Sequence, residues 1–327
     1  MRFKALLVFI SLLFSTSAFS YPINWKSLDQ YVGTRSKAEI LSDLRILLQR
    51  ESAEVTAHFN QHIQFERNSI QVISETGAVE YEFPFEDKKD STPRVRGAKP
   101  LDGYKIAIDG NNMGHVDPSY FDQTQKISSL LAQKLEKEGA TVLITQPRIP
   151  MTVGEYAKIV DEIFAFEPDM ALAIRFKSGG LEQPDDTFVS FCPGCFTKGE
   201  LAAERFRYRF MHALVSGKLW ESAKLAAHIA AKVQGLKSNV KLLTNERTFG
   251  QNACGIPLDA PIAETVETLG LKAEGSAFVP GVLGRNLFFN AVPALVNVWI
   301  NPGHDFTSQD PETIAETYFQ GILSYLK

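Results

Sequence analysis

The residues best suited to chemistry form a polar turn that follows a short apolar segment. Residues 106–108 are Ile, Ala and Ile, and residues 109–115 read Asp-Gly-Asn-Asn-Met-Gly-His. In α/β proteins, a strand that ends in such a turn delivers polar side chains to the carboxyl edge of a parallel sheet, where ligands usually bind. We therefore expect a candidate site that includes Asp109, Asn112 and His115.

His115 supports a metal-binding interpretation and two simpler ones. Imidazole and carboxylate groups are common zinc ligands, and Asp117 and Asp122 follow His115 closely, while His304 follows the last apolar segment. A metal ion could therefore be held by His115 and Asp122. Alternatively, His115 and His304 are solvated loop residues at the edge of a sheet, or they bind a ligand without a metal.

The composition limits the classes of function. The chain has 327 residues, of which 44% are hydrophobic, so it can bury one sizeable core. Its net charge of -4 provides no basic excess for a nucleic-acid surface. The sequence also lacks a Gly-x-Ser-x-Gly nucleophile elbow and the glycine-rich loops of Walker and dinucleotide-binding sites.

Residues 1–20 have the pattern of a secretory signal. Arg2 and Lys4 form a charged start, residues 5–14 form an apolar run, and Ala18-Phe-Ser20 resembles a cleavage site. The run is shorter than the roughly 20 residues that span a bilayer. We therefore expect a mature protein that is exported, periplasmic or extracellular, without stable membrane insertion. A retained N-terminal anchor is the alternative.

The cysteines leave several interpretations open. In an exported chain, Cys192, Cys195 and Cys254 permit one disulfide, or they remain as structural thiols. The Cys192-Pro-Gly-Cys195 pair lacks the second pair that a structural zinc site needs. A redox-active pair and a metal-binding pair are the alternatives.

The elements that position the candidate site are expected in two units. A helix over 36–49, followed by a β-hairpin over 69–74 and 78–85, forms a small N-terminal α+β extension within residues 21–86. Residues 87–100 lose the apolar pattern and are interpreted as a linker. The main domain occupies residues 101–327.

Strands and helices alternate in this main domain. The expected strands are 104–109, 141–145, 170–176, 188–192, 240–243, 287–289 and 294–300, and the expected helices are 122–138, 153–166, 199–215, 219–234 and 311–325. Such alternation is typical of a doubly wound α/β fold. We expect a twisted, mixed, mostly parallel sheet with helices on both faces. The segment 244–285 is irregular, apart from a turn of helix.

Several strings in this domain resemble the zinc-dependent N-acetylmuramoyl-L-alanine amidases of the amidase-3 type, which are cell-wall hydrolases. The strings lie in order at residues 106–110, 131–145, 221–226, 284–290 and 293–296. The resemblance implies the amidase-3 fold over most of the main domain, with peptidoglycan as the substrate class.

The resemblance also implies positions for the zinc site, and this chain differs at each of them. In the family, two histidines and a glutamate hold zinc, and a second glutamate is the general base. The two histidine positions correspond to Asn112 and Arg175, and the ligand glutamate corresponds to Tyr120, with Asp122 as the nearest acid. The general-base position corresponds to Asn297. Arg175 is the most telling change, because a guanidinium has no lone pair for a metal.

These differences predict a catalytically degenerate protein without zinc or another cofactor. Arg175 would occupy the place of zinc and pair with Asp109, Asp122 or a ligand carboxylate. The expected ligand is peptidoglycan, a muropeptide or a cell-wall protein. The enzymatic alternative is an active or divergent peptidoglycan amidase with a relocated zinc site near His115 and Asp122. A structural or regulatory partner that uses its N-terminal unit as the contact surface is a third hypothesis.

Overall fold

The structure is a computed structural model that describes residues 35–48, 53–84, 97–111, 118–145, 162–163, 165–174, 188–190, 211, 215, 218–236, 241–243, 248–249, 252–253, 263–270, 296–301 and 310–327. The predicted export signal at residues 1–20 and residues 87–96 of the predicted linker lie outside this part of the chain. The same holds for Cys192, Cys195 and Cys254. The predicted helix 199–215 falls almost wholly outside it as well, and the predicted strand 287–289 does so entirely.

The N-terminal unit combines two helices with a three-stranded antiparallel sheet. Its elements are α1 (Lys37–Leu48), α2 (Ala53–His62), β1 (Ile63–Phe65), β2 (Ser69–Ile73) and β3 (Val79–Pro84), with the strand order β1-β2-β3. The predicted helix and hairpin are therefore confirmed as α1 and as β2 with β3, whereas α2 and β1 are additions that the sequence analysis did not predict. Ile70 and Val72 share one face of β2 and are buried in the core together with Phe59 of α2 and Ile40 of α1.

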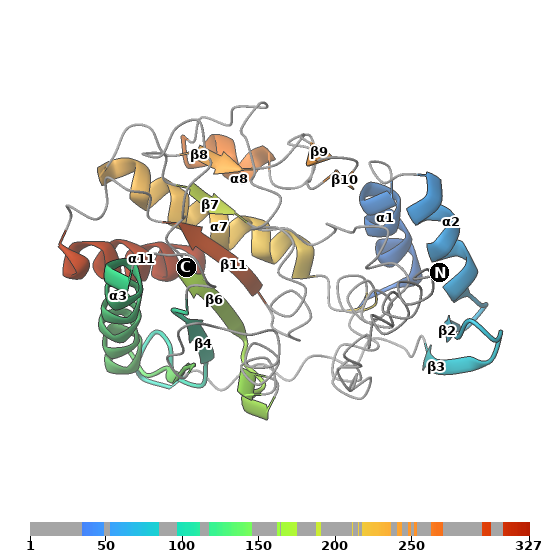
Figure 1. The fold of residues 1–327 in the computed structure, drawn as a ribbon, viewed down its shortest axis with the longest axis horizontal. Coiled ribbons are helices and arrows are strands. Elements are labelled where there is room, and N and C mark those ends of the chain that lie inside the picture. The colour runs from blue at the N-terminus through green and yellow to red at the C-terminus, as the bar shows by residue number, and fades with distance from the viewer. Residues whose placement is uncertain are drawn as a thin grey trace, which may run out of the picture.

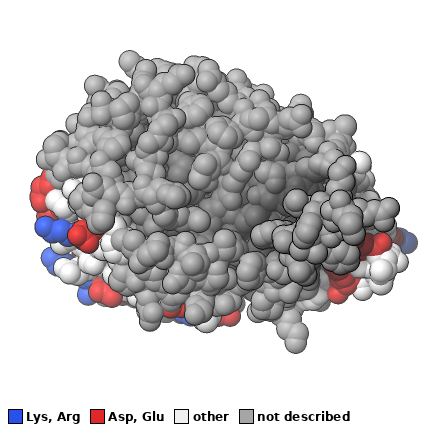
Figure 2. Space-filling model, viewed as in Figure 1, with Lys and Arg blue, Asp and Glu red and all other residues white. Residues whose placement is uncertain are grey.

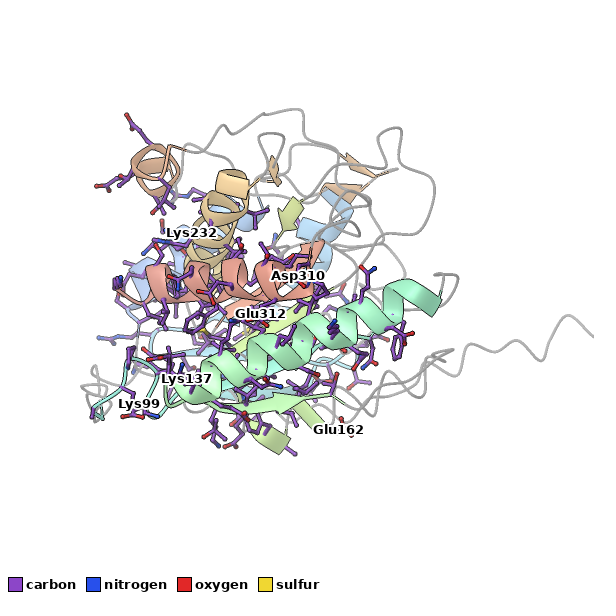
Figure 3. All side chains as sticks on the ribbon, turned by 90° about the vertical axis from the view of Figure 1, so that its left-hand side faces the viewer. Lys99, Lys137, Glu162, Lys232, Asp310 and Glu312 are labelled. Carbon is purple, nitrogen blue, oxygen red and sulfur yellow. The ribbon has the colours of Figure 1, made fainter. Side chains whose placement is uncertain are left out.

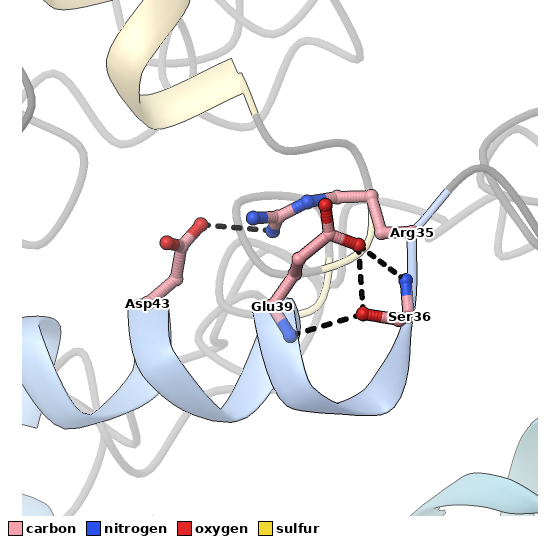
Figure 4. A network of polar contacts seen from close by, with 4 residues as sticks. All are labelled: Arg35, Ser36, Glu39 and Asp43. Carbon is pink, nitrogen blue, oxygen red and sulfur yellow. Dashed lines mark hydrogen bonds and ion pairs between the residues drawn. The ribbon is translucent and has the colours of Figure 1, made fainter.

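A reciprocal pair of hydrogen bonds fixes the start of α1 (Figure 4). The Glu39 backbone N–H donates to Ser36 Oγ at 3.3 Å, and the Ser36 backbone N–H donates to Glu39 Oε2 at 2.6 Å. This is a capping box, which satisfies backbone donors that a helix start otherwise leaves unpaired. Arg35 adds an ion pair of 2.8 Å with Asp43, one turn further along the helix. Ser36 is thus the N-cap residue of α1.

The main domain is built on a six-stranded mixed sheet. Its strands are β4 (Lys105–Asp109), β5 (Thr141–Ile144), β6 (Met170–Ile174), β7 (Phe188–Ser190), β8 (Lys241–Leu243) and β11 (Val296–Asn301), in the order β5-β4-β6-β11-β7-β8. The first four in this order are parallel, whereas β7 runs antiparallel to β11, and β8 runs parallel to β7. The fold is α/β with a mixed, mostly parallel sheet, as predicted.

Three long helices pack together against this sheet. They are α3 (Pro118–Lys137), α7 (Lys218–Leu236) and α11 (Pro311–Tyr325), and α11 lies between the other two (Figures 1 and 3). In Figure 3, Asp310 and Glu312 mark the start of α11. Gly321 allows α11 to approach α7 closely, because a Cβ atom there would lie 2.7 Å from Ile229 Cα. Lys134 of α3 forms ion pairs with Glu312 and Glu316 of α11.

The predicted bounds of α11 are confirmed, but α3 begins at Pro118 rather than at Asp122. Proline favours the first turn of a helix, because its fixed φ suits the helix and its missing N–H is not needed there. The buried stripe of α3 includes Ile127, Leu131 and Leu135, as the apolar period of an amphipathic helix requires. Its C-terminal end is followed by Gly139, whose φ of 101° turns the chain into β5.

The strand order indicates on which face of the sheet the connection from β5 to β6 should run. Residues 162–163 and 165–166 are helical and precede β6, and β4 lies between β5 and β6 in the sheet. This connection crosses the sheet in the direction opposite to α3, which joins β4 to β5. Because parallel crossovers are right-handed, the two connections belong on opposite faces. The short helix ends at Glu167, which has a φ of 52°.

Residues 97–103 tie the start of the main domain to the end of α3. Leu101 is fully buried, and its N–H donates to Glu138 O at 2.9 Å. Lys99 Nζ donates to Lys137 O at 2.8 Å, and Figure 3 shows the two lysines close together. Residues 97–100, which the sequence placed in the linker, are therefore attached to the main domain.

The segment 244–285 contains short regular elements. A two-stranded sheet pairs β9 (Thr248–Phe249) with β10 (Asn252–Ala253), and α8 (Ala263–Thr268) is the expected turn of helix. None of the described helices has the length and apolar character needed to cross a membrane. On the face drawn in Figure 2, described side chains of both charge signs lie next to one another, as the low net charge suggests.

Candidate functional site

The carboxyl ends of the parallel strands form one edge of the sheet. Asp109 of β4 pairs with Ala173 of β6, and Ile300 of β11 pairs with Ile174, the last residue of β6. Thr145 follows β5 directly, and its N–H donates to Ile108 O at 3.0 Å. The strand ends of β5, β4, β6 and β11 therefore meet at this edge, which is where the sequence placed the candidate site.

The expected site residues differ in how far the structure describes them. Side chains are described for Asp109 and Asp122, and only the backbone is described for Tyr120 and Asn297. The remaining candidates lie outside the described residues: Asn112, His115, Asp117, Arg175 and His304. Arg175 nevertheless has a defined place in the chain, because it follows Ile174 at the end of β6.

Asp109 is the centre of a buried hydrogen-bonded cluster. Its Oδ1 accepts hydrogen bonds from the Asn111 backbone N–H at 3.1 Å, from Asn111 Nδ2 at 3.0 Å and from Thr145 Oγ1 at 2.8 Å. Asn111 Nδ2 also lies 3.0 Å from Thr145 Oγ1. Each of these three side chains is fully buried. We call Asp109, Asn111 and Thr145 the Asp109 cluster.

The first of these bonds makes an Asx turn, in which an aspartate accepts from the backbone two residues later. This bond stabilises the abrupt turn at the end of β4. The donors of Asn111 and Thr145 supply the hydrogen bonds that a buried carboxylate needs, since burial of an unsatisfied charged group is costly. The cluster therefore joins the ends of two adjacent strands.

Helix α3 holds the same turn from the other side. Thr124 Oγ1 donates to Gly110 O at 2.6 Å, and Gln125 Nε2 lies 3.5 Å from Asn111 Oδ1. Gly110 is packed so closely that a Cβ atom would lie 2.5 Å from Ser128 Oγ and 3.1 Å from Thr124 O. Glycine is required here by space, so the Asp-Gly-Asn sequence and the polar face of α3 fit each other.

The environments of the two described acids are different. Asp109 is fully buried within the cluster, whereas the side chain of Asp122 is exposed on the first part of α3. Asp109 Oδ1 is already occupied by neutral donors from its own turn and from Thr145. Asp109 is therefore built into the turn that supports the edge, and Asp122 faces solvent beside it.

Asn297 lies within β11, before the carboxyl end of the strand. It is the second residue of β11 and pairs with Ala171, which in turn pairs with Ala107 of β4. Asp109 lies two residues nearer to the carboxyl edge than Ala107, which corresponds to about 7 Å along a strand. The residue of β11 that reaches the edge is Asn301, which the sequence reasoning did not select.

The described surroundings of Asp109 consist of neutral hydrogen-bonding groups. Zinc in proteins prefers histidine, cysteine and carboxylate ligands. Around Asp109 the structure instead places hydroxyl and amide groups, and among the described residues no group of three or more His, Cys, Asp or Glu side chains comes together as a metal site. The described residues of the Asp109 cluster are fully buried and hydrogen-bond to one another, so they support the edge from within.

Sequence reasoning identified Asp109 but missed its partners. Asn111, Thr145, Thr124 and Gln125 complete the site from three different elements. One signal was available, because an Asp two residues before an Asn after an apolar strand is typical of an Asx turn. Thr145 and Thr124 carried no comparable local signal.

Two histidines away from the edge have structural surroundings. His62 is buried, and its Nδ1 donates to Ile73 O at 2.8 Å. His228 of α7 is half-buried, and its Nδ1 lies 2.9 Å from Ser324 Oγ of α11. Burial lowers the pKa of His228 below its ordinary value, and the positive charges of Lys232 and Lys224 lower this pKa further.

Comparisons with known proteins identify similar folds. No family model and no curated protein matches the chain. Among solved structures, Ami1 of Mycobacterium abscessus, an N-acetylmuramyl-L-alanine amidase, has 13% identity over 69% of this chain and 100% of its own, with a TM-score of 0.41. AmiC2 of Nostoc punctiforme, an N-acetylmuramoyl-L-alanine amidase, has 14% identity over 70% of this chain and 99% of its own, with a TM-score of 0.36. The CwlD amidase of Clostridioides difficile, solved in complex with the GerS lipoprotein, has 16% identity over 68% of this chain and 98% of its own, with a TM-score of 0.36.

Proposed function

We propose that this chain is an exported protein that binds peptidoglycan through the carboxyl edge of its sheet and does not hydrolyse it by a zinc-dependent route. The proposal is supported by the ordered sequence resemblance to amidase-3 proteins and by the secretory pattern of residues 1–20. It is also supported by the position of the polar edge, since α/β proteins usually bind ligands at the carboxyl ends of their strands.

The observation that carries the proposal is the bonding of Asp109. At the turn where the resemblance expects a metal ligand, Asp109 Oδ1 accepts from Asn111 and Thr145. The buried carboxylate of this turn is therefore engaged by neutral hydrogen-bond donors. Arg175, which follows Ile174 in the sequence, would supply a permanent positive charge suited to the carboxylates of a peptide stem.

Peptidoglycan binding can be tested by pull-down. Mature protein, residues 21–327, would be incubated with insoluble sacculi and the retained fraction measured. Retention is expected, and Arg175→Ala should weaken it, because the variant removes the proposed contact to stem carboxylates. Arg207→Ala is the matched control, because the sequence predicts that Arg207 lies on the solvent-exposed face of a helix. Absence of retention would contradict peptidoglycan binding and would favour a protein partner.

Zinc content and hydrolysis test the second half of the proposal. The purified protein is expected to contain far less than one zinc per chain and to release no stem peptides from sacculi. One tightly bound zinc together with stem release would establish the enzymatic alternative. His115→Ala and Asp122→Ala would then show whether the metal is held near those residues. A variant that combines Asn112→His, Tyr120→Glu and Arg175→His is expected to gain zinc affinity.

A further inference from the structure

Strand β5 forms one end of the six-stranded sheet. It pairs in parallel with β4, and the described part of the chain has no strand on its other side. Thr141 is exposed, and the other three residues of β5 are partly exposed. An edge strand offers backbone N–H and C=O groups to a further strand, so β5 is a place where the sheet can be extended.

The hydrogen bonds at the two ends of β5 show which of its backbone groups are already used. The Thr141 N–H donates to Tyr104 O at 2.8 Å, and the Thr145 N–H donates to Ile108 O at 3.0 Å. Successive residues of a strand direct their backbone groups to opposite sides. Every second residue from Thr141 onward therefore bonds to β4, and the residues between them point away from it.

The residues that point away from β4 are Val142 and Ile144. Each has one N–H and one C=O group, and these groups have no hydrogen-bond partner among the described residues. Their spacing suits a second β5 strand that runs antiparallel to the first. Val142 of one copy then faces Ile144 of the other, and each such pair exchanges hydrogen bonds in both directions. Leu143 lies on the two-fold axis of this arrangement.

Strand β5 also lacks the features that usually keep an edge strand from pairing, which are charged side chains, proline and very short length. Strand β3, an edge of the N-terminal sheet, carries Glu80, Glu82 and Pro84. Strand β8, at the other end of the main sheet, begins with Lys241, and β1 is three residues long. By contrast, β5 reads Thr-Val-Leu-Ile, so among these described edges it is the one open to pairing.

The charge pattern around β5 favours a second copy of the same chain as the partner. In a two-fold dimer, residues near the axis lie close to their own copies, so a charged residue there would meet a like charge. Residues 139–145 contain no charged side chain. Val142 opposite Ile144 is in addition a pair of β-branched side chains, which suits neighbouring strands.

We propose that this chain forms a two-fold dimer through antiparallel pairing of β5 with β5 of a second copy. The two six-stranded sheets become one continuous sheet by this strand addition. Because the two β5 strands run in opposite directions, the Asp109 clusters of the two copies lie on opposite rims of the dimer. Under the proposed function, one dimer therefore contacts peptidoglycan on two sides, although dimer formation itself does not require that function.

Sedimentation equilibrium of the mature protein, residues 21–327, measures this association. The average mass should rise from one chain toward two between about 1 μM and about 100 μM, because a small interface gives modest affinity. Val142→Pro removes the outward N–H of both copies and leaves the bonds to β4 in place, since proline is tolerated where an edge strand faces solvent. Val142→Ala keeps this N–H and is the matched control for the lost side chain. Val142→Pro should weaken dimerisation at least about tenfold relative to Val142→Ala.

Cysteine crosslinking tests the register of the pairing. In this dimer the two Leu143 residues face each other as a non-hydrogen-bonded pair, with Cα atoms about 4.5 Å apart. A disulfide spans this distance, so Leu143→Cys should give a crosslinked dimer on mild oxidation. Thr141→Cys is the control, because its two copies lie about 13 Å apart along the strands although this residue is the more exposed one. The wild-type chain, which has three cysteines of its own, sets the background.

The outcomes decide the proposal in either direction. A mass of one chain at every concentration, without crosslinking of Leu143→Cys above background, would overturn it and would leave the edge to an extended peptide of another protein. Equal association of Val142→Pro and Val142→Ala would exclude pairing through β5. A mass that rises beyond two chains would contradict the two-fold arrangement, because that pairing uses all the free groups of β5.

If Val142→Pro does not fold, the comparison of Leu143→Cys with Thr141→Cys decides. Preferential crosslinking of Leu143→Cys supports the dimer, and equal crosslinking of both variants overturns it. Neither measurement uses sacculi, so the dimer and the proposed function can fail independently of each other.

Discussion

Gly321 of α11 lies against the backbone of Ile229 in α7, so that a Cβ atom on the glycine would come within 2.7 Å of Ile229 Cα. Gly321→Ala should therefore force the two helices apart and lower the free energy of unfolding by about 1–3 kcal/mol. Gly235→Ala in α7 is the control, because a Cβ atom there meets nothing within 4 Å. The control should gain up to about 1 kcal/mol from helix propensity. Urea denaturation measures the free energy of unfolding of both variants. Equal changes in the two variants would contradict the close contact between α11 and α7.

The side-chain hydroxyl of Tyr318 in α11 is buried. It has no hydrogen-bond partner among the residues that the structure describes. Burial alone raises the pKa of Tyr318. Tyr318→Phe should therefore be neutral or should stabilise the protein by about 1 kcal/mol. Tyr325→Phe on the same helix should instead destabilise it by a similar amount, because Tyr325 OH donates to Glu221 Oε2 at 2.7 Å. Thermal unfolding of the two variants is the measurement, and a large loss with Tyr318→Phe would reveal an essential partner.

His228 should make stability depend on pH. The pKa of His228 is lowered in the folded protein, first by burial and then by Lys232 and Lys224, so the folded state favours the neutral imidazole. The unfolded chain binds the proton more readily, so this contribution is present above the unfolded pKa of about 6.5 and is lost as the pH falls below it. The contact with Ser324 survives protonation, because Nδ1–H can still donate to Oγ.

The measurement compares urea midpoints at about pH 7.5 and about pH 5.5 in wild type and in His228→Gln. The wild type should lose more stability across this interval than the variant does. The groups described near His228 are Ser324 and Tyr325 of α11 and Glu221, Lys224 and Lys232 of α7. An identical pH response in both proteins would assign the dependence to other residues.

Glu167 has a φ of 52°, in the left-handed region that non-glycine residues adopt at a cost of about 1–2 kcal/mol. Glu167→Gly should relieve this cost and raise the free energy of unfolding by about 0.5–1 kcal/mol after the glycine entropy is subtracted. Glu136→Gly is the control, because Glu136 is exposed within helix α3 and its replacement should cost about 1 kcal/mol. Chemical denaturation should show that the free energy of unfolding rises in Glu167→Gly and falls in Glu136→Gly. A loss of stability in both variants would argue against strain at Glu167.

The sequence predicted those elements whose signals are local. The bounds of α11 follow from Pro311 at its start and from a regular buried stripe, and the hairpin of β2 and β3 follows from alternation around Glu75-Thr-Gly77. Strand β1 was missed because three residues, Ile63–Phe65, cannot establish a period. The start of α3 was placed too late because Pro118 gives a starting signal without an apolar stripe.

The candidate site was predictable only in its location. Asp109 was found because it ends an apolar strand, but its bonding to Thr145 spans 36 positions in the chain. No pattern of spacing reveals a hydrogen bond between separate strands, so the sequence predicted Asp109 at the site without its partner Thr145. In the same way, Asn297 was placed by similarity of sequence, whereas strand pairing with Ala171 sets its depth in the sheet.

The antiparallel direction of β7 matters for protein engineering. Its last residue, Ser190, pairs with Trp299, and both Trp299 and Asp109 pair with Ala173. Leu243 ends β8 beside Ser190. Tags or epitopes grafted after Ser190 or Leu243 would therefore start level with the Asp109 cluster, so an immobilised sensor should be tethered elsewhere if its working edge is to stay open.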